Sequence, residues 1–347
     1  MMQANQNNGP QKIELSPQAD LSAHLSGWTP ISAALGHDGK AYLLSIDERP
    51  ESEPGVALTK LKTCPAYKVL IVDLGFADVD SGLPGVDRPS VDRPSSGDRD
   101  DLADPATAQS AIREILIEGE SFHYHYVQPL GDELLVVGAN SRYYDRDRYD
   151  LNAAVFDHAG RAQRRFLLGD GVQQVQTTAE GLIWTSFFDE GVFGNRGWVR
   201  PVGESGLIAW DRNGIRVFTN SEANIADCYA LNAVSDEEVW FYYYTDFKLC
   251  RLSGPAAVPN VSFLDPGLSG SSLIAKDGES FLMDNGYGNY GTYTLMRQND
   301  SGALTAERTI EFVKPDGERI EHGMRDARGG QILLFEENKL YRFALNE

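Results

Sequence analysis

One local pattern recurs six times along the 347 residues of this chain. In each instance an alternating stretch leads into a tight turn rich in Gly, Asp and Glu, and a strongly apolar run with high β-propensity follows. Two such runs around turn residues are typical of a β-hairpin. The six segments are Ile31–Ile46, Tyr126–Ala139, Gln174–Phe188, Tyr229–Tyr244, Ser272–Asp284 and Gly323–Phe335.

The spacing of these hairpins predicts the fold. Four of the five intervals between successive turns lie between 41 and 56 residues, and the first interval is 93 residues long. Two further strand-like runs follow most hairpins, so a repeat of about fifty residues holds four strands, as in the blade of a β-propeller. A single sandwich or barrel does not show such a regular interval. We therefore predict an all-β, six-bladed β-propeller.

The two ends of the chain suggest how the ring closes. The last repeat stops after its third strand, Lys339–Phe343, and lacks a fourth. The N-terminal stretch Gln11–Leu15 is short, alternating and otherwise unpaired. We predict that it supplies the outer strand of the last blade, which also removes an exposed sheet edge. Residues 11–347 then form one propeller domain, preceded by a disordered N-terminus at residues 1–10.

The long first interval contains an insertion at about residues 77–110. It is rich in Pro, Gly, Ser and Asp and includes the tandem pair Val86–Ser90 and Val91–Ser95. A segment of this composition buries too little apolar surface to offset its ordering entropy. We predict a flexible surface excursion in preference to a recognition arm. Asp104 and Pro105 predict a short helix at its end, through Ala111.

Composition excludes several classes of function. The chain carries 51 acidic and 31 basic residues, a formal charge of −20, which disfavours binding to bare nucleic acid or to an anionic membrane. Its apolar runs are too short to span a bilayer, and its first residues lack the apolar core of a secretory signal. Three cysteines are too few for a disulfide framework or a zinc site. We expect a cytoplasmic monomer.

Two segments carry a resemblance to a known superfamily. Asp326–Leu334 and Trp210–Gly214 resemble repeat pieces of the six-bladed NHL-repeat and gluconolactonase (senescence-marker) propellers. As a pattern the resemblance covers most of the chain and implies the same fold. In gluconolactonases an early Glu and later Asn and Asp residues hold a metal. Those sequence contexts have no counterpart in this chain, so no site residue is carried over.

Polar residues recur where the second strand of each blade should end. In a propeller these positions lie around one mouth of the central channel. Ca²⁺ takes six to eight oxygen ligands, so the ring predicts a calcium site and, as one alternative, a metal-dependent hydrolase or lactonase. The other interpretation is that Asp and Asn end strands because their side chains bond to turn backbone. The candidate ligands are Asp47, Asn140, Asp189, Asp246, Asp284 and Asn338.

Two of the connecting loops, residues 141–150 and 188–198, are long and rich in aromatic and charged side chains. Binding residues concentrate on long loops over a rigid scaffold, and aromatic faces beside Arg and Asp suit a sugar or another polar ligand. The alternative is that the rings only cover the core. The predicted ligand-binding residues are Tyr143, Tyr144, Arg146, Asp189, Asn195, Arg196 and Trp198.

Evidence for catalysis in the sequence is slight. Asp189 and Glu190 could act as an acid/base pair, because neighbouring carboxylates raise one another's pKa. His322 begins the innermost strand of the last blade and is a third candidate. No nucleophile elbow or phosphate loop is present. We therefore favour a propeller that binds a polar small molecule or a protein partner at one mouth of its channel.

Overall fold

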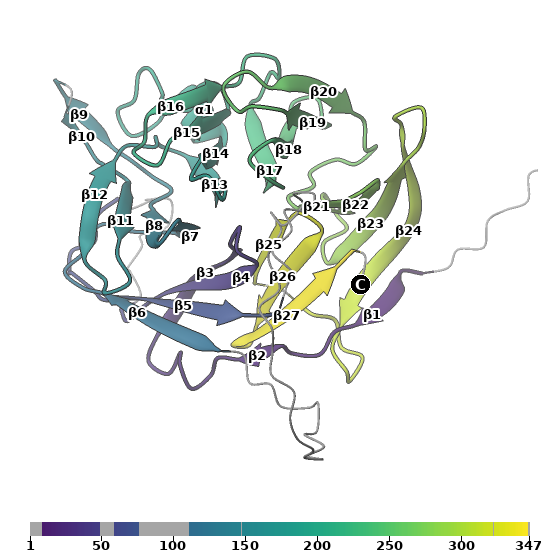
Figure 1. The fold of residues 1–347 in the computed structure, drawn as a ribbon, viewed down its shortest axis with the longest axis horizontal. Helices are drawn as coiled ribbons and strands as arrows, with labels where there is room; N and C mark the ends of the chain where they lie inside the picture. The colour runs from purple at the N-terminus through teal and green to yellow at the C-terminus, as the bar shows by residue number, and fades with distance from the viewer. Residues whose placement is uncertain (1–8, 49–58, 76–110, 147, 322, 346–347) are drawn as a thin grey trace, which may run out of the picture.

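The computed structural model describes residues 9–48, 59–75, 111–146, 148–321 and 323–345. Within them six blades, each with four antiparallel strands, stand around a common axis, as the ring of ribbons in Figure 1 shows. The innermost strands contact one another in the order β3, β7, β13, β17, β21, β25 and back to β3. This closed circuit is a six-bladed β-propeller, which confirms the fold predicted from the hairpin spacing.

Each of the six predicted hairpins forms the inner half of a blade. Blade 1 consists of β3 (Thr29–Leu35), β4 (Lys40–Ile46), β5 (Tyr67–Asp73) and β6 (Ile112–Ile117). Blade 2 consists of β7 (Tyr126–Leu130), β8 (Glu133–Val137), β11 (Ala153–Phe156) and β12 (Ala162–Phe166). Blade 3 consists of β13 (Val172–Thr177), β14 (Ile183–Phe187), β15 (Leu207–Trp210) and β16 (Arg216–Thr219).

Blades 4 to 6 follow the same antiparallel order from the axis outwards. They consist of β17 (Asp227–Ala233), β18 (Glu238–Tyr244), β19 (Lys248–Ser253) and β20 (Asn260–Leu264); β21 (Ile274–Asp277), β22 (Ser280–Asp284), β23 (Thr292–Gln298) and β24 (Leu304–Val313); and β25 (Met324–Arg328), β26 (Gln331–Glu336), β27 (Lys339–Ala344) and β2 (Ala19–Asp20).

The ring closes through the N-terminal segment, but not through the predicted residues. Strand β1 (Gln11–Glu14) adds in parallel to β24 at the outer edge of blade 5. The outer strand of blade 6 is instead β2, which pairs antiparallel with β27. The prediction of closure by an N-terminal strand is confirmed, whereas its assignment to Gln11–Leu15 is wrong. Two residues suffice for β2 because Leu21, directly after it, is fully buried between blades 6 and 1.

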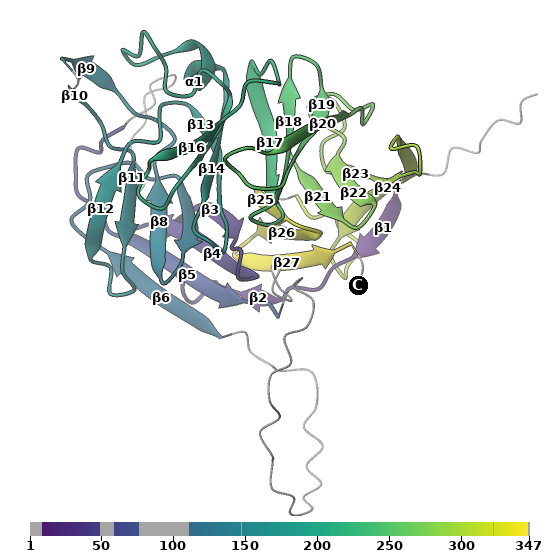
Figure 2. The same ribbon diagram turned by 45° about the horizontal axis from the view of Figure 1, so that its top comes forward.

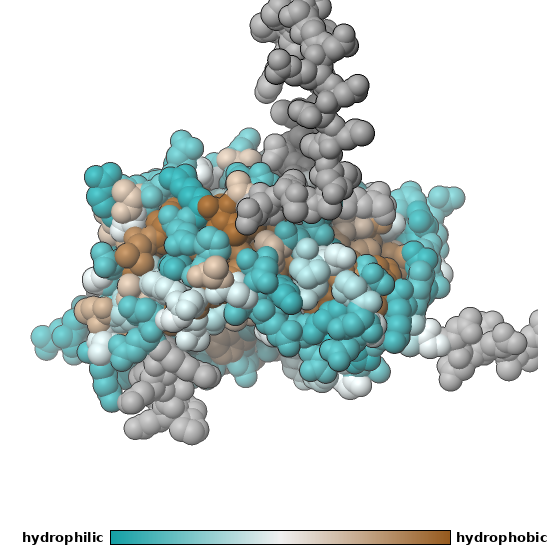
Figure 3. Space-filling model, turned by 90° about the horizontal axis from the view of Figure 1, so that it is seen from below, coloured by the Kyte–Doolittle hydropathy of each residue, from teal (hydrophilic) through white to brown (hydrophobic). Residues whose placement is uncertain are grey.

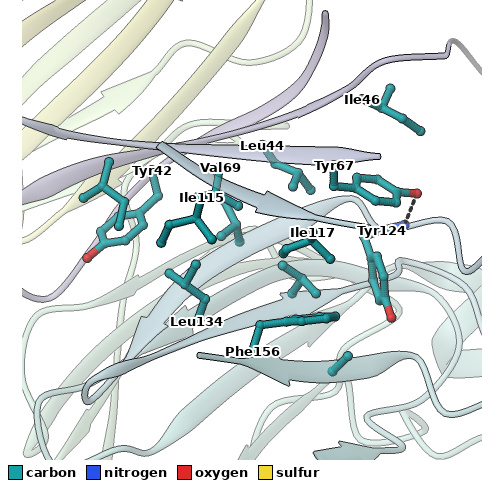
Figure 4. Packing of buried hydrophobic residues seen from close by; sticks show 14 of the residues in the cluster. Tyr42, Leu44, Ile46, Tyr67, Val69, Ile115, Ile117, Tyr124, Leu134 and Phe156 are labelled. Atoms are coloured by element: carbon teal, nitrogen blue, oxygen red, sulfur yellow. Dashed lines mark hydrogen bonds between the residues drawn. The ribbon is translucent and has the colours of Figure 1, made fainter. Parts of the chain in front are cut away.

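The blades pack face to face, which explains why the second strands read as continuous apolar runs. In β4 every residue after Lys40 is buried, since a neighbouring blade covers each face of the sheet. Figure 4 shows one such interface, where Val69 and Ile115 of blade 1 meet Leu134 and Phe156 of blade 2. The outer face shown in Figure 3 is mostly hydrophilic, as expected for a chain of charge −20.

Four polar side chains tie the innermost strands together near the axis. Gln128, Gln176, Asn232 and Asp326 come from blades 2, 3, 4 and 6. Gln176 accepts a hydrogen bond from a backbone N–H of blade 4 at 2.7 Å and donates to a carbonyl of blade 6 at 2.9 Å. The backbone N–H of Leu35 in blade 1 donates to Asp326 Oδ2 at 2.7 Å. These bonds therefore link the inner edges of the blades directly.

The connections between second and third strands lie on one face of the ring, called the upper face here. Two of them carry extra elements, the hairpin of β9 (Tyr143–Asp145) and β10 (Arg148–Tyr149) and the short helix α1 (Asp189–Phe193), which project on the same side in Figure 2. The predicted insertion, with its short helix, lies outside the described residues except for its rejoining strand β6. Among the described residues no helix is long and apolar enough to cross a membrane.

Candidate functional site

A cavity of roughly 320 Å³ lies on the propeller axis and opens toward the upper face. Its wall comes from the first halves of the innermost strands, and its floor is the layer of Gln128, Gln176 and Asp326 described above. A volume near 300 Å³ is at the lower end of the range of small-molecule sites. The remaining lining side chains used below are Ile31, Ser32, Tyr126, Gln173, Gln174, Tyr229, Ser272 and Arg325.

β-Bulges shape the wall of this cavity. The pairing register slips by one residue at Ile31 in β3, at Gln173 in β13 and at Tyr229 in β17. All three extra residues line the cavity. A bulge inserts one unpaired residue and re-aims its side chain, and bulges are common beside functional sites. Three blades thus use the same local device near the same opening.

Two polar atoms of the wall lack a hydrogen-bond partner within the described part of the chain. They are the hydroxyl Oγ of Ser32 and the amide oxygen Oε1 of Gln174. Buried polar atoms are nearly always paired, because an unpaired one loses the hydration it had in the unfolded chain. Both residues line the cavity. The atoms themselves are shielded from solvent, so a hydroxyl or amine of a bound molecule would pair with them once the two side chains turn toward the cavity.

The charged groups of the wall are already engaged. Arg325 donates to Asp284 Oδ2 and to Ser272 Oγ, each at 2.7 Å. Asp284 is 1% exposed and accepts four further bonds from residues 271–273, two of them from the backbone N–H groups of Ser272 and Leu273. This buried ion pair joins blades 5 and 6. The guanidinium is therefore neutralised where it meets the cavity.

Asp326 is the acidic group of the cavity floor. It is partly buried, it lines the cavity, and its Oδ2 accepts the backbone N–H of Leu35. Burial raises its pKa to about 6, opposed by hydrogen bonds from the backbone of Leu35 and Ala327. The carboxyl group can therefore change its protonation state near neutral pH.

The six candidate metal ligands all lie on or beside upper-face connections, as predicted, but none lines the cavity. Asp47, Asp189 and Asp246 are exposed, and Asn338 adopts a positive φ of 62° in the turn before β27. Asp47 accepts a bond from the N–H of Ala66 at 3.0 Å, so it serves turn backbone.

The other two candidate ligands are buried. Asn140 lies beyond β8 and its Oδ1 lacks a partner among the described residues, while Asp284 belongs to the ion pair above. No three His, Cys, Asp or Glu side chains of the described ranges are grouped to hold a metal ion. Calcium binding stays a prediction, which a calcium-dependent rise in melting temperature would test.

The two long loops pack against each other above blades 2 and 3. Trp198 donates its indole N–H to the carbonyl of Ser141 at 2.7 Å, and its ring lies 5.2 Å from that of Tyr143. Arg196 bridges Asp170 at 3.2 Å and Glu190 at 2.6 Å. Tyr144, Arg146 and Asn195 are exposed, and none of the seven predicted ligand-binding residues lines the central cavity.

The predicted catalytic candidates are also separated. Glu190 is paired with Arg196, whereas Asp189 opens α1 and accepts the N–H of Glu190 at 2.7 Å. The charge of Asp189 acts instead on Asp227 at the start of β17: burial first, and Asp189 second, raise the pKa of Asp227 to about 6. His322 lies outside the described residues. Sequence reasoning did not single out Asp227.

Sequence reasoning also missed the wall of the cavity. The available signal was Gln173, Gln174 and Gln176, three carboxamides within one innermost strand. Polar side chains that are predicted to be buried need partners, and at the axis of a propeller those partners are other blades or a ligand.

Comparisons with known proteins leave the family open. No protein-family profile and no curated protein matches the chain. Among solved structures, a catalytically inactive virginiamycin B lyase from Staphylococcus aureus with quinupristin has 9% identity to this chain and a TM-score of 0.45. The match covers 96% of this chain and 99% of the lyase chain.

Two other solved structures resemble the chain to a similar degree. U3-55K has 9% identity and a TM-score of 0.49, and the match covers 97% of this chain and 100% of U3-55K. The WD40 repeats of RRP9 have 10% identity and a TM-score of 0.47, and the match covers 91% of this chain and 79% of that one. At such identities a likeness concerns the fold alone. The resemblance to the NHL-repeat and gluconolactonase superfamily stays a prediction.

Proposed function

We propose that this propeller binds a small polar molecule in its axial cavity. The observation that carries the proposal is the pair of unpartnered polar atoms, Ser32 Oγ and Gln174 Oε1, in the wall of one cavity. They come from blades 1 and 3, so one ligand that bonds both would connect distant parts of the ring. The bulges at Ile31, Gln173 and Tyr229 support the proposal, since each adds a side chain to this wall.

The lining favours a neutral ligand over an ion. Its polar groups are mainly carboxamides and hydroxyls. Of its two charged groups, Arg325 is paired with Asp284, and the Asp326 carboxyl of the floor accepts the N–H of Leu35. Tyr126 donates its hydroxyl hydrogen to the backbone carbonyls of β13, so its ring is fixed at the wall. A cavity of this kind orients a ligand by hydrogen bonds and packs it by aromatic contact. A protein partner remains an outcome of the test below.

The proposal is tested by screening polar metabolites for a rise in melting temperature. Sugars, polyols, nucleosides and amino acids form the library, because a ligand at one hundred times its Kd stabilises the folded state by about 2.7 kcal/mol. Each compound that stabilises the wild type is then titrated into Gln174→Leu. We expect at least tenfold weaker binding, since one lost hydrogen bond is worth about 1.5 kcal/mol.

Gln163→Leu is the matched control. Gln163 lies on the outer strand β12 and is exposed, so this variant should bind as tightly as the wild type. Equal binding by Gln174→Leu, or a library in which nothing stabilises the wild type, would contradict a small-molecule site in the cavity. Capture of a protein that competes with no small molecule would favour the partner alternative.

A further inference from the structure

Five aromatic rings form one contact network beside the cavity opening, on blades 4 and 5. We call this network the tyrosine rim. Its ring centroids lie 5.4–6.5 Å from their neighbours, a range typical of packed aromatic pairs. Its members are Tyr229, Tyr242, Tyr244, Phe247 and Tyr287. Because Tyr229 also lines the cavity, the rim continues the cavity wall onto the upper face.

Two rings of the rim are held in place and yet open to solvent. Tyr287 is 52% exposed and Tyr244 is 43% exposed. The ring of Tyr287 rests on Gly270, where an added Cβ would lie 2.6 Å from it. The hydroxyls of Tyr287 and Tyr229 are hydrogen-bonded to each other. The rim therefore offers fixed aromatic faces to the outside, next to a polar cavity.

Phe247 reaches the rim through an unusual backbone conformation. Its φ is +53°, in the left-handed region that bulky residues rarely adopt, and its N–H bonds the carbonyl of Tyr243 at 3.0 Å. Its ring packs against Tyr242, Tyr244 and Tyr287. Residues in such conformations persist only where the surrounding structure holds them, and they concentrate at binding sites.

Resting on the proposed function, we propose that the ligand is a neutral oligosaccharide of at least two sugar rings. One ring occupies the cavity, and the next ring stacks on Tyr287 and Tyr244. Tyr229 belongs both to the cavity wall and to the rim, so a chain with one ring in the cavity can place its next ring on the rim. The edge at blades 4 and 5 is the tyrosine rim.

The chemistry of the two parts matches the two sides of a sugar. Hydroxyl groups both donate and accept hydrogen bonds, as the carboxamides of the wall and the unpartnered Ser32 Oγ and Gln174 Oε1 require. The C–H groups on one face of a pyranose ring are apolar and pack on a tyrosine ring, which is amphipathic itself. Neither part requires a charged ligand.

The test uses an array of neutral oligosaccharides of one to six units, built from hexoses, pentoses or N-acetylhexosamines. Hits are measured by isothermal titration calorimetry. We expect chains of two or more units to bind at least tenfold more tightly than the corresponding monosaccharide. Tyr287→Ala combined with Tyr244→Ala should remove this advantage, while Tyr287→Phe should keep most of it because the stacking face remains.

Tyr290→Ala is the matched control, because Tyr290 is 70% exposed on the same loop as Tyr287 but has no ring contact with the rim among the described residues. It should bind every chain like the wild type. A single cooperative thermal transition shows that the rim variants fold. Their melting temperature should fall somewhat, because both rings are about half buried and pack on other rings of the rim.

The results separate this inference from the proposed function. If no array member binds, or if the rim variant binds longer chains as tightly as the wild type does, the oligosaccharide proposal is wrong. The proposed function still stands in either case if a metabolite binds the wild type and loses affinity in Gln174→Leu. If Gln174→Leu changes nothing while the rim variant does, the cavity proposal fails on its own.

Discussion

Replacing Asp284 by Asn tests whether this carboxylate is a structural ion or a free ligand. In the structure it is 1% exposed, accepts the N–H groups of Ser272 at 2.6 Å and Leu273 at 3.0 Å, and pairs with Arg325 at 2.7 Å. The amide introduced by Asp284→Asn can keep the backbone bonds but presents a donor to the guanidinium. Removing one partner of a buried ion pair costs about 3–5 kcal/mol. Since the Arg325 side chain remains 19% exposed, we expect about 3 kcal/mol.

The assay is urea unfolding at pH 7, followed by tryptophan fluorescence and analysed by linear extrapolation. Asp246→Asn is the matched control, because Asp246 occupies the corresponding connection of blade 4 and is exposed. It should change the free energy of unfolding by less than about 0.5 kcal/mol. In Asp284→Asn with Arg325→Met the loss should be smaller than the sum of the single losses. A loss below about 1 kcal/mol for Asp284→Asn, or one seen only with calcium present, would refute the structural role.

Two further predictions concern the axis and the closure of the ring. Folding raises the pKa of Asp326 to about 6, so between about pH 4 and 6 the folded protein holds a proton that the unfolded chain has released. The stability of the wild type should therefore fall relative to that of Asp326→Asn as the pH rises from about 4 to about 6. The difference in unfolding free energy between the two proteins should change by on the order of 2 kcal/mol over this pH range. It is measured from urea midpoints at several pH values, and midpoints that run parallel for the two proteins would contradict the prediction. Leu21→Ala should lower the free energy of unfolding by about 2–5 kcal/mol, because Leu21 is fully buried between blades 6 and 1. Ile13→Ala on β1 should lower it by less than about 1.5 kcal/mol. Equal losses for the two variants in calorimetry would argue against closure by β2.

The blades could be predicted from sequence because their signals are local. A tight turn such as the one at Gly39 sits between two apolar runs, and the interval between turns is set by the four strands of a blade. Closure depended on a weaker signal. Gln11–Leu15 alternates like a strand, and its first four residues form β1. Strand β2 is only two residues long and is fixed by the burial of Leu21, which depends on tertiary packing and leaves no local sequence pattern.

The candidate site was harder to predict for a related reason. Counting residues from each turn reached the upper face, and the candidates do lie there, but it gave no distance from the axis. The aromatic loops drew attention because they are long, yet Trp198 and Tyr143 pack on each other. The cavity wall depends on register slips at residues such as Tyr229, and neither the composition nor the spacing of the sequence predicts these slips.

The pairing of β2 with β27 also determines the order in which the ring can be completed during synthesis. The ribosome makes Ala19 and Asp20 long before their partners Leu340 and Lys339, because the five intervening blades are translated between them. Blades 1 to 5 can each form their antiparallel hairpins as they appear, whereas the last sheet must wait. Until then the apolar flanks of the first and last sheets stay uncovered, so nascent chains stalled before Leu340 should be those that chaperones retain.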